Sequence, residues 1–222
     1  MSRNKCGRCG VVNLANDTLC RRCGSSLNGE NSAEAGLVEG SVKRRSFWRS
    51  LIWIAGTTAL ILFIGYVSLL LTSADLSYDQ TQTINKALAL LVQKGFDKQV
   101  FVLNRLARYR GTDNWWNRYL GHHDAYAATN FPFEIVTLYP EFFQDAVDDN
   151  ERAVILLHES FHLLGSGEEG ALEGVWRNKQ RLGWTSDKYG KTKVWVNTRE
   201  LTMAQVPDLF VCGADGKSDC IQ

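Results

Sequence analysis

Residues 154–176, "VILLHESFHLLGSGEEGALEGVW", hold two histidines four positions apart in a segment that begins with an apolar run. Residues four apart on a helix project from one face about a turn apart. The imidazoles of His158 and His162 would therefore lie side by side, with Glu159 next to the first of them. This stretch predicts a helix that presents two nitrogen donors and a carboxylate to a common site.

The start of that helix is also visible in the sequence. Asp148 is a candidate N-cap, and Glu151 three residues later completes a capping-box pattern. The run Ala153–Leu157 is apolar throughout, as expected of a helix inside a domain. Buried polar groups are costly without partners, so two histidines and a glutamate in this helix need one. A metal ion would supply it; hydrogen-bonded core histidines are the alternative.

The pattern H-E-x-x-H resembles the zinc-binding motif of the zincin metallopeptidases. The resemblance implies that His158 and His162 bind zinc and that Glu159 acts as the catalytic base. The longer pattern H-E-x-x-H-x-x-G-x-x-E resembles the extended metzincin motif, which has His or Asp where this chain has Glu168. In the gluzincins the third ligand is a glutamate on a following helix. Glu168 is therefore the predicted third ligand, and Glu169 and Glu173 remain alternatives.

The same resemblance suggests further features. Phe133–Tyr139, "FEIVTLY", is a predicted strand, and in zincins an edge strand near the active-site helix pairs with extended substrate. Met203 is a candidate for the methionine turn of metzincins. Tyr189, His122 and His123 are candidate donors to the transition state. Each also has an ordinary structural explanation, as a core, surface or loop residue.

An uncharged segment precedes this domain. Its dense part, Leu51 to Leu71, has 21 residues. At 1.5 Å per residue, that length crosses a hydrocarbon layer of about 30 Å. We expect one transmembrane helix over residues 47–73, because a buried helix rarely stays apolar on every face for so long. Nearly fifty residues precede it, which disfavours a cleaved signal peptide.

Charges on either side of this helix predict its orientation. The flanking residues are basic before the helix and acidic after it: Lys43, Arg44, Arg45 and Arg49, then Asp75 and Asp79. Basic flanks stay on the cytoplasmic side. We therefore expect a single-pass membrane protein with a cytoplasmic N-terminus. Residues 75–222 would form a periplasmic or extracellular domain.

The N-terminal region has four cysteines in a C-x2-C-x10-C-x2-C pattern: Cys6, Cys9, Cys20 and Cys23. Two such pairs can direct four thiolates at one tetrahedral Zn²⁺. Residues 1–25 resemble the small zinc ribbons found at the N-termini of many bacterial membrane proteins. Residues 26–46 lack periodicity and are predicted to be a flexible linker. A cytoplasmic protein partner is a candidate for the ribbon. Nucleic acid is not expected, since the net charge is only +1.

The other two cysteines, Cys212 and Cys220, enclose the short polar segment "GADGKSD". Both follow the membrane helix, on the side that the flanking charges assign to an oxidising compartment. A disulfide between them is therefore predicted, whereas the four N-terminal cysteines are expected to stay reduced.

Together these features predict an α+β protein with three parts. They are a small N-terminal zinc ribbon, one transmembrane helix, and a zincin-like outer domain over residues 75–222 whose active-site helix packs on a small sheet. The expected function is that of a membrane-anchored zinc-dependent peptidase with one structural and one catalytic Zn²⁺, acting on a peptide or protein substrate. The alternative is a non-catalytic signalling or scaffold protein whose outer domain binds zinc.

Overall fold

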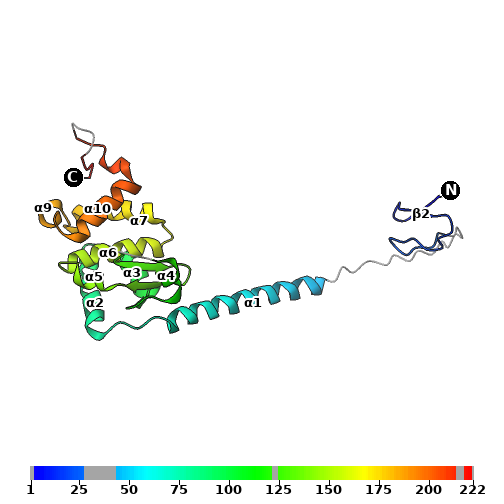
Figure 1. Ribbon diagram of the computed structural model, residues 1–222, viewed down its shortest axis with the longest axis horizontal. Helices are drawn as coiled ribbons and strands as arrows, with labels where there is room; N and C mark the ends of the chain where they lie inside the picture. Colours follow the sequence, from blue (N-terminus) through cyan, green and yellow to red (C-terminus); the bar gives the residue numbers. More distant parts are fainter. Residues whose placement is uncertain (1–2, 28–43, 122–124, 214–217, 222) are drawn as a thin grey trace. The chain divides into compact units, whose positions relative to one another are not determined.

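The computed structural model describes residues 3–27, 44–121, 125–213 and 218–221. The chain forms two compact units, residues 1–54 and residues 55–222. Figure 1 traces the chain through both. Most of the linker predicted over residues 26–46 lies outside the described residues. The described structure is mostly helical with two small sheets, in agreement with the predicted α+β class.

The N-terminal unit starts with an antiparallel hairpin of β1 (Arg3–Lys5) and β2 (Val12–Leu14). A glycine follows each C-x2-C pair and has positive φ, 70° at Gly10 and 66° at Gly24. Glycine adopts this conformation without steric cost. The amide of each glycine donates to the carbonyl of the first cysteine in its pair, at 2.9 Å and 2.8 Å. Both cysteine pairs are thus held in closed turns.

One long helix, α1 (Arg44–Leu71), contains the apolar segment. Its part Phe47–Leu71 is long and apolar enough to cross a membrane, and only 6% of its apolar window is buried. A core helix of a soluble protein would be largely covered, so this alternative is not favoured. The helix begins at Arg44, three residues before the predicted start at residue 47. It ends at Leu71, two residues before the predicted end at residue 73. From residue 65 onward its side chains become partly covered.

The rest of the second unit is a small mixed domain of helices around a short sheet. Its elements are α2 (Tyr78–Gln93), α3 (Asp97–Arg105), β3 (Arg108–Arg110), α4 (Trp115–Leu120), β4 (Ala127–Asn130), β5 (Ile135–Leu138), α5 (Pro140–Gln144), α6 (Asp149–Leu163), α7 (Glu168–Arg177), α8 (Lys179–Leu182), α9 (Ser186–Tyr189), α10 (Lys193–Gln205) and the 3-10 helix η1 (Pro207–Phe210). The predicted helix around the two histidines is α6.

The sheet of this domain has the order β3-β5-β4, with β3 parallel and β4 antiparallel to β5. The strand predicted in Phe133–Tyr139 is β5. It is the central strand, and all four of its residues are buried. The expectation that this segment offers a free edge is therefore wrong, since both of its edges carry ladder hydrogen bonds. β4 is the edge strand on the side of the candidate site, with Thr129 opposite Val136.

The two faces of the sheet carry different layers. On one face, Val136 and Leu138 join the apolar core, where α6 packs against α2, α3 and α7. On the other face, Thr137 accepts a hydrogen bond from the Asn117 amide of α4 at 3.1 Å. The sheet alternation explains this division, because successive side chains of a strand point to opposite faces. The candidate site lies on the α6 side.

The start of α6 follows the predicted N-cap. The carboxylate of Asp148 accepts from the amides of Asn150 and Glu151 at 3.0 Å and 3.1 Å. The predicted capping box is modified: Glu151 accepts from the amide of Val147 at 3.0 Å instead of the N-cap amide. Glu151 is fully buried and also accepts from the side chain of Thr192. The carboxylates of this turn therefore tie α6 to its neighbours.

We expect Asp148→Ala to lower the free energy of unfolding of the domain formed by residues 75–222 by about 1 kcal/mol at neutral pH. Its side chain is 37% exposed, so solvent screening keeps the loss near the lower end of the range for N-caps. Burial opposes its charge, but Tyr189, the Glu151 amide and Lys188 outweigh burial and lower the pKa of Asp148. The measurement is urea unfolding of both proteins in detergent.

This carboxylate stabilises the fold fully above its unfolded pKa of about 3.9, and the stabilisation is lost as pH falls through the lower folded-state pKa. The difference between wild type and Asp148→Ala should therefore shrink as unfolding is measured at progressively more acidic pH. A difference that stays constant from neutral to acid would contradict the role of the charge.

The C-terminal segment is held by a covalent bond and an ion pair. Cys212 and Cys220 form the predicted disulfide. The ammonium of Lys179, which is buried, pairs with Asp219 at 2.5 Å, and the indole of Trp176 donates to the same carboxylate at 3.1 Å. These contacts fasten the end of the described chain to α7 and α8.

Candidate metal centres

The four N-terminal cysteines are positioned to hold one metal ion. Their sulfur atoms lie within 4.8 Å of one another. Cys6 Sγ lies 3.6 Å from Cys23 Sγ, and Cys9 Sγ lies 3.5 Å from Cys20 Sγ. Sulfurs bound tetrahedrally to zinc at 2.3 Å would be about 3.8 Å apart, so the cluster needs little adjustment. This confirms the predicted cluster of four thiol ligands.

A hydroxyl supports two of these sulfurs. Ser25 Oγ lies 3.1 Å from Cys6 Sγ and 3.0 Å from Cys23 Sγ. The Ser25 hydrogen bond is the largest influence on Cys6, and with the backbone amides nearby it lowers the pKa of that thiol to about 6. Because the thiolate is the form that binds metal, this contact prepares the sulfur for an ion.

The second cluster consists of His158, His162 and Glu168. The two Nε2 atoms of the histidines are 3.0 Å apart. Glu168 Oε1 lies 3.4 Å from Nε2 of His158, and Oε2 lies 3.3 Å from Nε2 of His162. Ligand atoms bound tetrahedrally at about 2.1 Å would be separated by about 3.4 Å. The donors therefore converge on one point with the spacing that zinc requires, and three donors leave a fourth position open.

A glycine turn brings the glutamate to the histidines. The helix α6 ends at Leu163, and Gly165 follows with φ of 88°. The amide of Ser166 then donates back to the carbonyl of Phe161 at 2.9 Å. The chain reverses within four residues, and Glu168 becomes the first residue of α7. Its carboxylate thereby reaches the last turn of α6.

The same turn orients one imidazole. Nδ1 of His162 donates to the carbonyl of Ser166 at 3.0 Å, which directs Nε2 toward the cluster. Burial opposes a charge on His162, but Glu168, Glu159 and the Ser166 carbonyl raise its pKa to about 9. Hydrogen bonds from His158 and His162 hold the pKa of Glu168 far below its usual range. These directions favour a charged pair of His162 and Glu168, and a metal ion bound here would take the place of the proton.

Glu159 lies beside this cluster and is almost fully buried, with 4% of its surface exposed. Its Oε2 accepts a hydrogen bond from the hydroxyl of Thr129 at 2.6 Å. Thr129 belongs to the edge strand β4, so the sheet fixes the carboxylate of a helical residue. Among the described residues, Oε1 of Glu159 has no hydrogen-bond partner, and the side chain lines the pocket described next.

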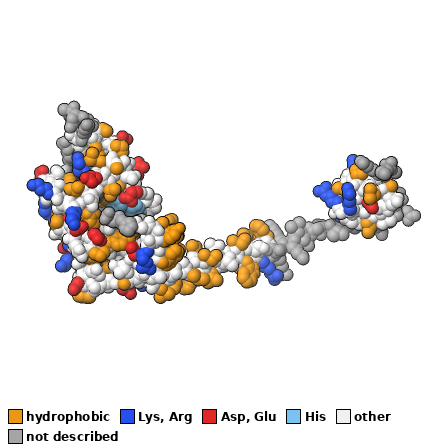
Figure 2. All heavy atoms as spheres, in the orientation of Figure 1, with side chains coloured by type: hydrophobic (Ala, Val, Ile, Leu, Met, Phe, Trp, Pro, Cys, Tyr) orange, Lys and Arg blue, Asp and Glu red, His pale blue; other side chains and the backbone are white. Residues whose placement is uncertain are grey.

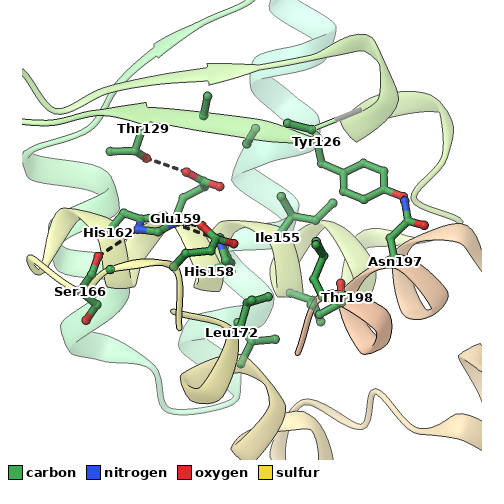
Figure 3. A pocket seen from close by; sticks show the side chains of 18 of the residues that line it. Tyr126, Thr129, Ile155, His158, Glu159, His162, Ser166, Leu172, Asn197 and Thr198 are labelled. Carbon is green, nitrogen blue, oxygen red and sulfur yellow. Dashed lines mark hydrogen bonds and ion pairs between the residues drawn. The ribbon is translucent and has the colours of Figure 1, made fainter. Parts of the chain in front are cut away.

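The His158–His162–Glu168 cluster and Glu159 line one pocket of about 970 Å³. Figure 3 shows His158, Glu159 and His162 of α6 on one wall, with Thr129 above them. Across the pocket, Asn197 of α10 donates to the hydroxyl of Tyr126 at 3.0 Å. Residues 125–129 of the edge strand and the segment before it form a long side of this pocket. β4 thus forms part of the pocket wall.

The structure distinguishes between the three glutamates that the sequence offered as the third ligand. Glu168 belongs to the cluster. Glu173 pairs with Arg177 at 2.7 Å on the exposed side of α7. Glu169 is exposed and is not among the residues that line the pocket. Glu168 therefore has the geometry of the third ligand.

The other zincin-like candidates lie elsewhere. Tyr189 is buried at the opposite end of α6, where its hydroxyl donates to Asp148 at 2.8 Å. Met203 lies within the helix α10, partly exposed, so it forms no turn beneath the cluster. Tyr189 is therefore not placed to act on a substrate at the cluster, and Met203 does not form a methionine turn. Each has a structural position in this domain instead. His122 and His123 lie outside the described residues.

Sequence reasoning missed Thr129, Tyr126 and Asn197. They reach the pocket from a strand, a loop and a distant helix, so no local spacing marks them. The signal available at Thr129 was weak, since "AATN" has little of the β-branched and aromatic character of a strand. No protein-family model, curated protein or solved structure matches the chain. Function is therefore inferred from the geometry of the site.

Proposed function

We propose that the protein is a membrane-anchored zinc-dependent peptidase. One observation carries this proposal: a His158–His162–Glu168 donor cluster lies beside the buried carboxylate of Glu159 in a single pocket. Two histidines and a glutamate are a common ligand set of catalytic zinc, which keeps a fourth position for water. A structural zinc site would use its four positions for protein ligands and would need no neighbouring base.

Zinc, when bound, would activate water and polarise the peptide carbonyl. The chain supplies proton transfer. The free Oε1 of Glu159 would accept the proton of the attacking water, while Thr129 holds Oε2. The same carboxyl group would then deliver this proton to the nitrogen of the departing amine. The nearly complete burial of Glu159 keeps bulk water from competing for that proton.

An extended peptide is the substrate that this pocket favours. Within the part of the chain that the structure describes, β4 pairs with β5 alone, and residues of β4 line the pocket. A free strand edge offers backbone donors and acceptors that match an extended chain. The role predicted for Phe133–Tyr139 is therefore transferred to β4 (Ala127–Asn130). The pocket beyond it is mainly lined by α6, α7 and α10.

The proposed location is a single-pass membrane position with the peptidase domain on the outer side. The apolar part of α1 and the basic residues before it support this topology, with Asp75 and Asp79 following it. The disulfide between Cys212 and Cys220 fits an oxidising compartment. The zinc ribbon would then lie in the cytoplasm, available to a protein partner.

The test is hydrolysis of a broad quenched-peptide library by the purified full chain in detergent, with zinc supplied, for wild type and Glu159→Gln. Cleavage by the wild type alone supports the proposal. A protein that binds zinc at the outer domain and cleaves nothing would favour the non-catalytic scaffold instead. Zinc at the cysteines alone would overturn both.

A second variant tests how Glu159 is held. We expect Thr129→Val to lower kcat about 10-fold to 100-fold, because a hydrogen bond to a charged group contributes roughly 1.5–3 kcal/mol and valine has a similar shape. KM and zinc content should stay near wild type, since Thr129 contacts none of the three ligands. Thr129→Ser, which keeps the hydroxyl, is the control and should retain most activity. Equal losses in both variants would point to packing and not to the hydrogen bond.

A further inference from the structure

The helix α1 has two parts that differ in exposure. Residues 47–64 are all exposed, whereas residues 65–70 are partly or fully covered by the outer domain. The exposed part has 18 residues, and at 1.5 Å per residue it spans about 27 Å, close to the hydrocarbon thickness of about 30 Å. Arg49 lies near its N-terminal end, where a long charged side chain can reach the interface. On the proposed transmembrane position, the helix therefore leaves the hydrocarbon near Gly65. The domain starts at that level.

The last turns of the helix are joined to the domain by a buried arginine. Arg110 at the end of β3 donates to the carbonyl of Leu70 at 2.7 Å and to the hydroxyl of Ser73 at 2.9 Å. It also forms an ion pair with Asp75. A guanidinium at the C-terminal end of a helix satisfies free carbonyls and complements the helix dipole. The domain is thus fixed to the end of α1.

Helix α4 lies against the same turns. The indole of Trp115 donates to Ser68 Oγ at 3.0 Å, and the amide of Trp115 donates to Thr72 Oγ1 at 3.2 Å. In the turn between β4 and β5, the ring of Phe133 stacks near Tyr66 at a centroid distance of 6.3 Å. Both segments therefore lie beside the C-terminal turns of α1, where the proposed transmembrane helix leaves the hydrocarbon.

These two segments expose large apolar side chains, which we call the aromatic platform: Trp115, Trp116, Tyr119, Leu120 and Phe131, with exposed fractions of 43%, 40%, 77%, 50% and 71%. The rings of Trp115, Trp116 and Tyr119 contact one another in sequence. Figure 2 shows hydrophobic side chains continuing from the domain end of α1 onto the adjoining surface, where Figure 1 labels α4. Contiguous exposed patches of this kind mark interaction sites.

We infer that the aromatic platform lies in the interfacial layer of the membrane that α1 spans. Tryptophan and tyrosine favour this layer, because their rings are apolar and their N–H or O–H groups remain hydrated. The surface is continuous with the exposed part of the helix, so the leaflet adjoins it in any orientation that keeps α1 across the bilayer. Lipid is therefore the occupant that the geometry favours over a second protein.

Buried hydrogen bonds fasten α4, which carries most of the platform, to the sheet. Asn114 is the N-cap of α4, and its side-chain amide donates to Asn130 of β4 at 2.7 Å. Asn130 in turn donates to Asn117 at 2.6 Å, and Asn117 donates to Thr137 at 3.1 Å. All four side chains are buried. This polar layer fastens α4 to the sheet face opposite the metal cluster.

The inference rests on the membrane position of α1 and not on peptidase activity, and its test uses no substrate. The full chain is reconstituted in phosphatidylcholine vesicles that contain a phosphatidylcholine with a photoreactive diazirine near the glycerol end of one acyl chain. After illumination, lipid adducts are located by mass spectrometry. We expect adducts on α1 and on residues 115–120. The exposed Phe101 of α3, on the other face of the sheet, should remain unlabelled.

Matched variants sharpen the result. Trp116→Ser with Tyr119→Ser should reduce labelling of α4 several-fold and leave labelling of α1 unchanged, whereas Phe101→Ser should change neither. Trp115 is kept because it bonds to α1. The inference would be overturned if α1 were labelled but α4 were labelled no more than α3. Cross-links through α4 between two copies of the chain would also overturn it. Absence of label on α1 would overturn the membrane position itself.

Discussion

The Glu159→Gln variant is expected to retain the zinc of the outer domain and to hydrolyse peptides about 100-fold to 10,000-fold more slowly. The glutamine has the same shape, and its amide oxygen can still accept the hydrogen bond from Thr129. What it loses is the ability to take a proton from water. Because Glu159 is not one of the three converging ligands, metal content should be unaffected.

The matched control is Glu169→Gln, which makes the same chemical change on an exposed residue outside the pocket. Its activity and zinc content should equal those of the wild type. The measurements are kcat/KM on a cleaved library peptide and zinc content by mass spectrometry. Full activity in Glu159→Gln would remove this residue from the mechanism, and loss of zinc would make it a ligand.

Glu168→Ala should weaken zinc binding by the outer domain by more than about 100-fold, because loss of an outer-shell partner alone costs roughly 10–100-fold. It removes the carboxylate that lies 3.4 Å and 3.3 Å from the two imidazoles. The two histidines alone would leave two positions of a tetrahedral ion to water. Hydrolysis should fall together with zinc occupancy.

Three controls separate this site from the rest of the chain. Glu169→Ala and Glu173→Ala should keep the outer zinc, since the first is exposed and the second pairs with Arg177. Cys20→Ser should release the zinc of the ribbon and leave the outer zinc in place. If Glu173→Ala and not Glu168→Ala lost the outer zinc, the assignment of the third ligand would be wrong.

Local spacing predicted the parts of the site that lie on one helix. His158, Glu159 and His162 needed only the helical period, and the N-cap at Asp148 needed only a start signal. The choice of Glu168 depended on the turn at Gly165. Its φ of 88° and the hydrogen bond from Ser166 to Phe161 decide which acid reaches the histidines. Spacing alone left three acids open.

Contacts between distant segments were not predictable in this way. β5 was correctly expected as a strand from its β-branched residues, but its central position follows from pairing with β3 and β4. β3 has the sequence "RYR" and β4 has "AATN", and neither shows clear apolar alternation. The Thr129–Glu159 bond joins residues 30 positions apart. Arg110 of β3, which bonds to the end of α1, likewise has no sequence signal beyond being one arginine among many.

For the proposed membrane-anchored peptidase, the buried Arg110 has a consequence for which substrates the domain can reach. Its bonds to Leu70, Ser73 and Asp75 join the end of α1 directly to the domain that follows it. A catalytic domain on a long flexible linker could reach a large volume around its anchor. Its effective concentration near any one substrate would fall as the linker lengthens. On the proposed membrane position, a domain bonded directly to its anchor would instead act at one height above the bilayer. The distance of a peptide bond from the membrane would then decide whether it is cleaved, before the substrate sequence does. A bond far from the membrane would stay intact even if its flanking residues fitted the pocket.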